Sequence, residues 1–263
     1  MPSILTSTVG RIIAVSAVLA ALALGWFVLS GAKPTYVVDV RAGQTLREVS
    51  YSVVNAKGTT WANMFTQALA NDVAESPFAQ GGPLEGLIGV GRYTIAPSTT
   101  PADLASRMID GFVKEAASVG LTPSTTLNGL NAYQLVVVAS IVEKEGYYPV
   151  NMPRVARVIY NRLARGGPLQ MDSTVLYYLG QDGGPVTPAD LQIKTPYNTY
   201  LNNGLTPTPI CAVSTIALQA TLHAPIGPWL FFTLVNQDGT MRFSSTFAQQ
   251  LAAEKFAQSR GIG

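Results

Sequence analysis

The sequence predicts an α+β protein in which helices form the centre of a membrane-anchored ectodomain and short strands flank them. Helix signals gather in the middle of the chain, whereas strand patterns occur near its two ends, at 36–40 and 229–243. Helices and strands that are grouped in this way, and do not alternate, favour α+β over α/β. The 263 residues are 48% hydrophobic and only 12% charged, which is enough for one good-sized core or two modest domains.

The N-terminal segment from Ile12 to Ser30 is almost entirely apolar. Its length is close to the roughly 20 residues that cross a bilayer, and it exceeds the core of about 7 to 15 residues of a cleaved signal peptide, which is the alternative. The short leading tail and the large following domain favour an amino terminus inside the cell. We therefore expect a cytoplasmic tail at 1–10 and a transmembrane anchor at 11–31 of a single-pass protein in the cytoplasmic membrane, with the remainder extracytoplasmic.

The region after the anchor begins with a strand and continues with helices. Residues 36–40 alternate as a strand does, and Thr45 is placed to cap the helix that follows. A second helix is expected at 61–75, before Ser-Pro. Residues 84–95 read as an irregular turn and a strand, and another helix starts within 98–103 and reaches about Val113.

The centre of the chain carries the clearest helix signals. Asn131 followed by Gln134 forms a capping pattern that heads an apolar segment reaching Glu145. Three consecutive valines there would also suit a buried strand, but the cap and the length favour a helix. A second helix opens at 151–153 and ends at 166–167; Arg162 projects from its apolar face and therefore needs an acceptor there.

The last third of the chain predicts a helix, a hairpin and a closing helix. Asp172 or Ser173 is placed to cap a helix that contains Tyr177. Residues 229–235 and 241–243 flank a Gln-Asp-Gly turn and read as a hairpin, and Phe247 to Gln258 as the closing helix.

The charge balance and the scarcity of cysteine and histidine exclude several functions. The 17 basic and 15 acidic residues form no basic run, so nucleic acid is not an expected partner. Cys211 and His223 are the only residues of their types, which excludes an internal disulfide and a Cys/His zinc site. A Cys211/His223 nucleophile pair is an alternative, but no acidic orienter or oxyanion motif accompanies it. We expect neither a metal nor a cofactor.

A carboxylate at the edge of the apolar segment 135–142 is the first candidate for chemistry. Glu143 ends this segment, and desolvation there would raise its pKa toward neutrality, which is the condition that a general acid needs. On a helix, small residues share the face of Glu143 and leave room beside it, whereas Glu145 is expected to point away.

An ordered set of motifs runs through the chain from Leu84 onward. The motifs are Leu84-Glu-Gly86 with Tyr93, Ala139-Ser-Ile-Val-Glu-Lys-Glu145, Val155-Ala-Arg-Val-Ile-Tyr-Asn-Arg-Leu163, Leu169-Gln170 with Asp172, Thr174-Val175, Pro196-Tyr-Asn-Thr-Tyr200, Gly204-Leu205 and Pro207-Thr-Pro-Ile210. In order and spacing, this set resembles the YceG-like, or MltG-type, endolytic murein transglycosylases. The resemblance covers about 84–260, and the ordered set is more specific than any single motif.

The resemblance implies an enzyme, a carbon-oxygen lyase anchored in the cytoplasmic membrane that cuts nascent peptidoglycan strands within the chain. It implies Glu143 as the catalytic acid and base. By the same resemblance, the substrate-binding positions are Glu85, Asn161, Arg162, Gln170, Asp172, Tyr197, Asn198, Thr199 and Tyr200. A structural role is open for each of them, since a buried pair of Arg162 with Asp172 would serve the fold equally well.

The resemblance also implies the domain organisation, with some departures from the family. A truncated LysM-like region is expected at 36–83 and the catalytic domain at 84–260. Residues 87–92 stand where the family carries an aromatic-Pro-Asp-Thr segment, and Met241 and Gln250 stand near the carboxyl end, where it commonly has histidines. The partners so implied are glycan strands, the cytoplasmic membrane and cell-wall synthases.

Two functions are therefore open. The first is a lytic transglycosylase that cleaves the bond between N-acetylmuramic acid and N-acetylglucosamine and leaves 1,6-anhydromuramyl ends. A hydrolase would need a second carboxylate, but Glu145 is expected to point away and Asp172 to be occupied by a cap or by Arg162. The alternative is a non-catalytic, membrane-tethered protein that binds glycan or acts as a scaffold for cell-wall synthesis.

Overall fold

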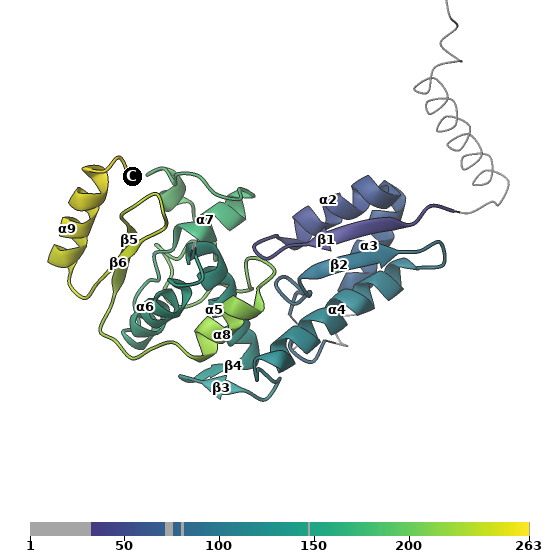
Figure 1. The fold of residues 1–263 in the computed structure, drawn as a ribbon, viewed down its shortest axis with the longest axis horizontal. Coiled ribbons are helices and arrows are strands. Elements are labelled where there is room, and N and C mark those ends of the chain that lie inside the picture. The colour runs from purple at the N-terminus through teal and green to yellow at the C-terminus, as the bar shows by residue number, and fades with distance from the viewer. Residues whose placement is uncertain (1–32, 72–75, 80–81, 147, 263) are drawn as a thin grey trace, which may run out of the picture.

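The computed structural model describes residues 33–71, 76–79, 82–146 and 148–262. The predicted cytoplasmic tail and membrane anchor lie outside these residues. Within the described part of the chain, no helix is both long enough and apolar enough to cross a membrane. The described residues form a mixed α+β structure with small antiparallel sheets, as predicted (Figure 1).

The first unit of the fold is a two-stranded antiparallel sheet covered by helices (Figure 1). Its strands pair in a register that joins Tyr36 to Ile95 and Val40 to Gly91. Helices α2 (Leu46–Lys57) and α4 (Pro101–Ser118) pack on the sheet, and α3 (Thr59–Asn71) lies against both helices. The elements are β1 (Tyr36–Val40), α2 (Leu46–Lys57), α3 (Thr59–Asn71), β2 (Gly91–Ile95) and α4 (Pro101–Ser118).

The packing of this unit extends across the predicted domain boundary between residues 83 and 84. Strand β2 is the hydrogen-bonded partner of β1, and α4 packs on α3. Both β2 and α4 therefore group with the residues that precede 84. A local pattern could not reveal this grouping, because the pairing strands are about fifty residues apart in the sequence. The LysM-like and catalytic labels of the two regions stay predictions.

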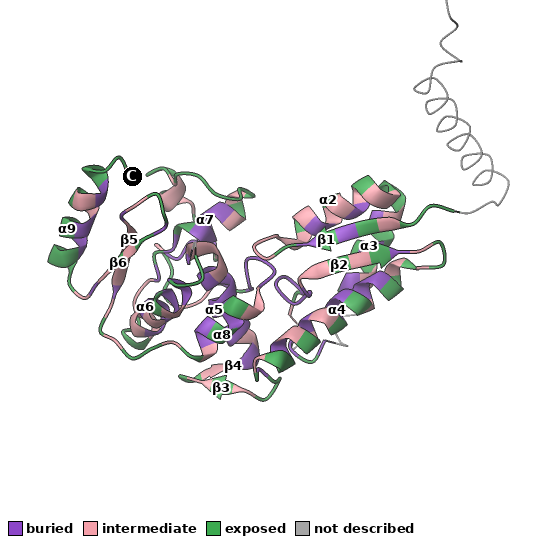
Figure 2. Ribbon diagram, in the orientation of Figure 1, coloured by how far each residue is buried: buried purple, intermediate pink, exposed green. Residues whose placement is uncertain are grey.

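The second unit surrounds α5 (Ala132–Glu145), whose residues from Leu135 to Val142 are all buried. Helices α6 and α8 pack on α5 and on each other, and Figure 2 shows the buried residues gathered where they meet. The β5–β6 hairpin and α9 lie at the far end of the molecule. The other elements are β3 (Thr126–Leu127), β4 (Leu130–Asn131), α6 (Met152–Ala164), α7 (Asp172–Leu179), a short 3₁₀ turn (Asp190–Gln192), α8 (Thr215–Leu222), β5 (Phe231–Leu234), β6 (Met241–Ser244) and α9 (Phe247–Gln258).

Most predicted elements are present, and the differences have physical reasons. Helix α4 extends to Ser118, beyond the expected end near Val113. Met171 stands at the N-cap of α7, where Asp172 or Ser173 was expected, because both of those side chains bond to distant residues. Helix α8 was not predicted; its eight residues show almost no amphipathic pattern, and Ser214 caps it.

The loop between β1 and α2 joins the first unit to the second. The Gly43 amide donates to the Ala212 carbonyl at 2.8 Å, and the Ala212 amide donates to the Gln44 carbonyl at 2.7 Å. Residue Ile210 of the same segment donates its amide to Ser140 Oγ in α5. The loop is therefore fastened close to the central helix, next to the carboxylates at its end.

Candidate active site

The carboxylates Glu143 and Glu145 lie in the last turn of α5 and line one hollow of about 570 Å³. The hollow lies between the β1–α2 loop on one side and helices α5 and α7 on the other; Arg41, Gln44 and Ser173 also line it. The expectation that Glu145 points away from the site is therefore wrong. The hollow extends around the end of the helix, so residues on different helical faces reach it.

Glu143 is bound to the start of helix α8. Its Oε2 accepts hydrogen bonds from the Ser214 amide at 2.9 Å and from Ser214 Oγ at 2.6 Å. Ser214 Oγ in turn accepts from the Ala217 amide, so Ser214 caps α8 and positions Glu143 together. These contacts suit a carboxylate that holds α8 against α5.

Glu145 occupies a different environment. Burial raises its pKa, two hydrogen bonds from Ser173 partly offset this effect, and the nearby charge of Asp172 raises the pKa further. The bonds join Glu145 Oε1 to the Ser173 amide at 3.1 Å and to Ser173 Oγ at 2.7 Å. Arg162 acts in the opposite direction, as the smallest of these effects. A carboxyl group with a raised pKa can hold a proton near neutral pH, as a general acid must.

A second hollow, of about 400 Å³, adjoins the first. Glu145 and Asp172 line both hollows, so they lie where the two meet. Other lining residues of the second hollow are Arg162, Gln170, Tyr200, Phe231, Phe232, Thr233, Phe247, Gln250 and Glu254. An extended polymer could therefore cross the carboxylates with one part in each hollow.

Arg162 projects from α6 toward the site, as predicted, but its partners differ from those expected. Its guanidinium donates to the backbone carbonyls of Leu230, at 2.7 Å, and of Leu169. It forms no ion pair with Asp172; the ion pairs within the described residues are Lys144 with Asp182 and Arg92 with Asp39. Asp172 instead accepts a hydrogen bond from the Tyr200 hydroxyl at 2.5 Å. The expected Arg162–Asp172 pair is therefore corrected to a Tyr200–Asp172 pair.

Some of the remaining predicted site residues line the hollows, and others are buried and hold loops of the fold in place. Gln170, Asp172 and Tyr200 line the hollows with Arg162. Asn198 and Thr199 are buried, and their side chains bond to backbone groups of neighbouring loops.

Asn161 and Tyr197, which were also predicted to bind substrate, form hydrogen bonds within the protein. Asn161 donates to the carbonyls of Gly227 and Trp229. Tyr197 bonds to Thr208 and packs its ring on Tyr177. Of the Tyr-Asn-Thr-Tyr segment, Tyr200 is the residue that lines the second hollow.

Comparison with known proteins identifies the family of the chain. The model of the YceG-like family matches residues 12–255. The chain belongs to the YceG-like family. The endolytic murein transglycosylase of Bacillus subtilis (strain 168) is 30% identical over 240 residues, which are 89% of this chain and 65% of that protein. The endolytic murein transglycosylase of Streptococcus pneumoniae serotype 2 (strain D39) is 31% identical over 167 residues, 62% of this chain and 30% of that protein.

A solved structure resembles the fold of this YceG-like chain. The crystal structure of a protein described as YceG-like, from Listeria monocytogenes, matches with a TM-score of 0.72 and 26% identity. The match covers 84% of this chain and 76% of the other. The YceG-like chain spans less than two thirds of the length of the two named transglycosylases.

Glu85 of the YceG-like chain lies between the two units. It is 7% exposed, accepts a hydrogen bond from the Leu46 amide at 3.0 Å, and accepts a second from the Tyr177 hydroxyl at 3.1 Å. Burial raises its pKa from 4.5 to about 7. Its two partners belong to α2 and α7, so Glu85 links the units, and it lines neither of the two hollows.

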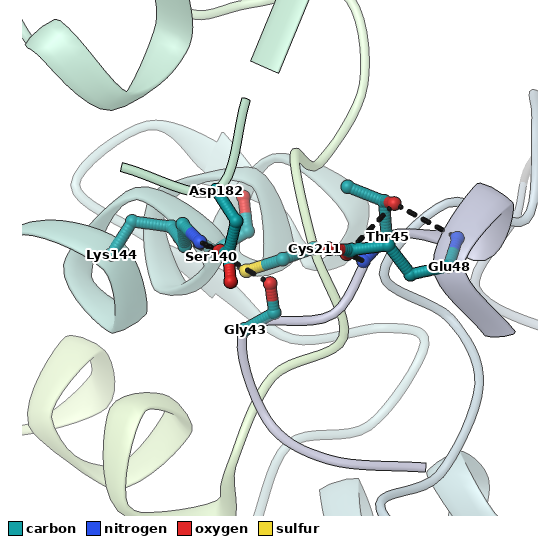
Figure 3. A network of polar contacts seen from close by, with 7 residues as sticks. All are labelled: Gly43, Thr45, Glu48, Ser140, Lys144, Asp182 and Cys211. Atoms are coloured by element: carbon teal, nitrogen blue, oxygen red, sulfur yellow. Dashed lines mark hydrogen bonds and ion pairs between the residues drawn. The ribbon is translucent and has the colours of Figure 1, made fainter. Parts of the chain in front are cut away.

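Lys144 also lies at the YceG-like site, although it was not predicted as a site residue. Lys144 forms an ion pair with Asp182 and donates to the Gly43 carbonyl at 3.4 Å, as Figure 3 shows. These contacts join the end of α5 to the loop after α7 and to the β1–α2 loop. Lys144 stands within the Glu-Lys-Glu motif, but its partners are 38 and 101 residues away, so spacing alone could not reveal them.

Cys211 and His223 show no features of a nucleophile pair. Cys211 is fully buried beside Ser140, to whose carbonyl its thiol donates at 3.4 Å (Figure 3), and burial raises the pKa of that thiol well above its usual value. His223 lies at the end of α8. The thiol is therefore a packing residue of this YceG-like fold.

Proposed function

We propose that this YceG-like chain is an endolytic peptidoglycan lytic transglycosylase. The observation that carries the proposal is Glu145, a carboxyl group with a raised pKa at the point where two hollows meet. Hollows on both sides of an acid suit cleavage within a long strand. The relatives named endolytic murein transglycosylase support peptidoglycan as the substrate. The bond cleaved is the one between N-acetylmuramic acid and N-acetylglucosamine of nascent strands.

The contacts of the two glutamates support Glu145 as the general acid, whereas the motif resemblance assigns that role to Glu143. Both hydrogen bonds of Glu143 come from Ser214, which caps helix α8. Glu145 has the raised pKa and reaches both hollows. We therefore infer that Glu145 transfers the proton and that Glu143 holds α8 in position.

The proposed reaction uses one carboxyl group twice. Glu145 donates its proton to the glycosidic oxygen as the bond from that oxygen to C1 of the muramyl residue breaks. The muramyl C6 hydroxyl then attacks C1, and the Glu145 carboxylate accepts the hydroxyl proton. The new bond from O6 to C1 closes a 1,6-anhydro ring, and no water is consumed. The attacking hydroxyl belongs to the reacting sugar, so its effective concentration is high.

The product distinguishes this reaction from hydrolysis. Asp172 lies near Glu145 and lines both hollows, so it is a candidate for the second carboxylate of a hydrolase. Mass spectrometry of uncrosslinked glycan strands digested with the full chain should show anhydromuramyl ends, lighter by one water than reducing ends. Predominantly reducing ends would mean hydrolysis and would require a second carboxylate near Glu145, such as Asp172. Binding without any cleavage would favour the non-catalytic scaffold.

The setting of the reaction is also part of the proposal. We infer a single-pass anchor at 11–31 in the cytoplasmic membrane, an extracytoplasmic catalytic region, and cell-wall synthases as partners, from the apolar sequence of that segment and the family. In cells, the full chain should sediment with membranes, and protease added outside should cut it. Recovery of the intact chain in the soluble cytoplasmic fraction would contradict the anchor.

A further inference from the structure

One wall of the second hollow is aromatic and comes from the carboxyl-terminal elements. We call Phe231 of β5 and Phe247 of α9 the aromatic wall; their ring centroids lie 6.2 Å apart at an interplanar angle of 57°. Phe247 is the first residue of α9 and is 64% exposed. Such exposure leaves most of its ring free to contact another molecule.

A buried amide beside the aromatic wall has an unused acceptor. Gln250 is 8% exposed, and its Nε2 donates to Thr233 Oγ1 at 2.5 Å and to Glu254 Oε1 at 2.9 Å. Its Oε1 has no hydrogen-bond partner in the described part of the chain. Gln250 lines the hollow, and buried acceptors are nearly always satisfied, so an unused acceptor on this residue points to a ligand donor.

The hollow combines the groups that bind a sugar ring. A pyranose has faces of C–H groups, which pack on an aromatic ring, and a rim of hydroxyl and amide groups, which hydrogen-bond. The aromatic wall provides the first kind of contact and Gln250 the second. The hollow is also lined by Gln170, Asp172 and Glu254. These polar side chains suit a polar ligand better than an apolar protein surface.

We propose that the aromatic wall and Gln250 form a sugar subsite next to the bond that is cleaved. This inference rests on the proposed function, because Glu145 and Asp172 line the same hollow. Phe247 packs on one face of a pyranose ring of the strand. Gln250 Oε1 accepts a hydrogen bond from a hydroxyl or an acetamido N–H of that ring.

Binding to an inactive protein tests the subsite separately from cleavage. The full chain with Glu145→Gln is titrated calorimetrically with uncrosslinked glycan strands that lack stem peptides. Adding Phe247→Ala should raise Kd about three- to tenfold, which corresponds to the binding free energy of one aromatic contact. Phe247→Tyr keeps the ring and should bind as the parent does. Gln250→Met keeps the shape without the acceptor and should also raise Kd, with its unfolding temperature measured in parallel.

Leu251→Ala is the matched control. Leu251 is an exposed side chain of the same helix that does not line the hollow, so its removal should leave Kd unchanged. Equal affinities of the Phe247→Ala and Leu251→Ala proteins, with the parent still binding, would overturn the subsite and leave the proposed function intact. A parent protein that binds no strand at all would overturn both. Binding that requires stem peptides would replace the sugar by a peptide as the ligand.

Discussion

Replacing Glu145 by glutamine should reduce cleavage of glycan strands about a thousandfold or more. The amide keeps the size of the side chain but has no acidic proton for the glycosidic oxygen, and general acid–base catalysis contributes about 10²–10⁴-fold. The amide oxygen of the Glu145→Gln variant would still accept the two hydrogen bonds that Glu145 Oε1 receives from Ser173, so folding should change little. The rate at which new muramyl ends appear, measured with the full chain on uncrosslinked strands, tests this expectation.

Glu143→Gln is the matched control, because it makes the same change two residues earlier in the same helix. We expect cleavage to fall less than about tenfold, and the free energy of unfolding to decrease by about 1 kcal/mol, because an amide oxygen is a weaker acceptor for the two hydrogen bonds from Ser214. Reversed results, with Glu143→Gln inactive and Glu145→Gln active, would establish the assignment that the motif resemblance implies.

Glu85→Gln should change how the stability of the protein depends on pH. The folded-state pKa of Glu85 is raised from 4.5 to about 7, so ionisation of this buried group opposes folding. Its stabilising contribution is fully present below about pH 4.5 and is lost as the pH rises through about 7. A shift of this size corresponds to a loss on the order of 3 kcal/mol above pH 7. An amide does not ionise, so the variant should keep this stability at pH 8.

The measurement is denaturant unfolding of the wild type and the variant at several pH values from about 4 to about 8, which span the raised pKa. The pKa of Glu115 is also raised to about 7, so the test is the difference in pH profile between the wild type and the variant. Asp110→Asn changes an exposed carboxylate of α4 and should leave the pH profile as it is in the wild type. Parallel profiles of wild type and Glu85→Gln would show that Glu85 ionises freely in the folded protein.

Local signals in the sequence account for much of the fold. The N-cap at Thr45 and the capping pattern of Asn131 with Gln134 are local signals, and the structure confirms both. The β5–β6 hairpin and α9 are likewise present where turn residues and patterns predicted them. The family, too, could be read from ordered motifs, and the family match confirms it. In each case the interacting residues are close in sequence, or the order of motifs is itself the evidence.

Pairings between distant segments required the tertiary structure. Strand β1 pairs with β2 across about fifty residues, so the first unit extends past the division that motif positions suggested. Arg162 was predicted to point inward, but its acceptors are backbone carbonyls, which any sequence supplies and no motif marks. Glu85 was expected to contact substrate, whereas its oxygens join α2 to Tyr177.

The sequence by itself determined the helix that carries the carboxylates and the family to which the chain belongs. Only the tertiary structure showed that Glu143 and Glu145 have different hydrogen-bond partners. Helical spacing gives their directions around the axis of α5, but the environment of each oxygen is set by residues elsewhere. Ser214 lies 71 residues after Glu143, and Ser173 lies 28 residues after Glu145. The pKa of a carboxyl group depends on burial and on nearby charges and hydrogen-bond donors, and folding brings these together from segments that are separate in the chain.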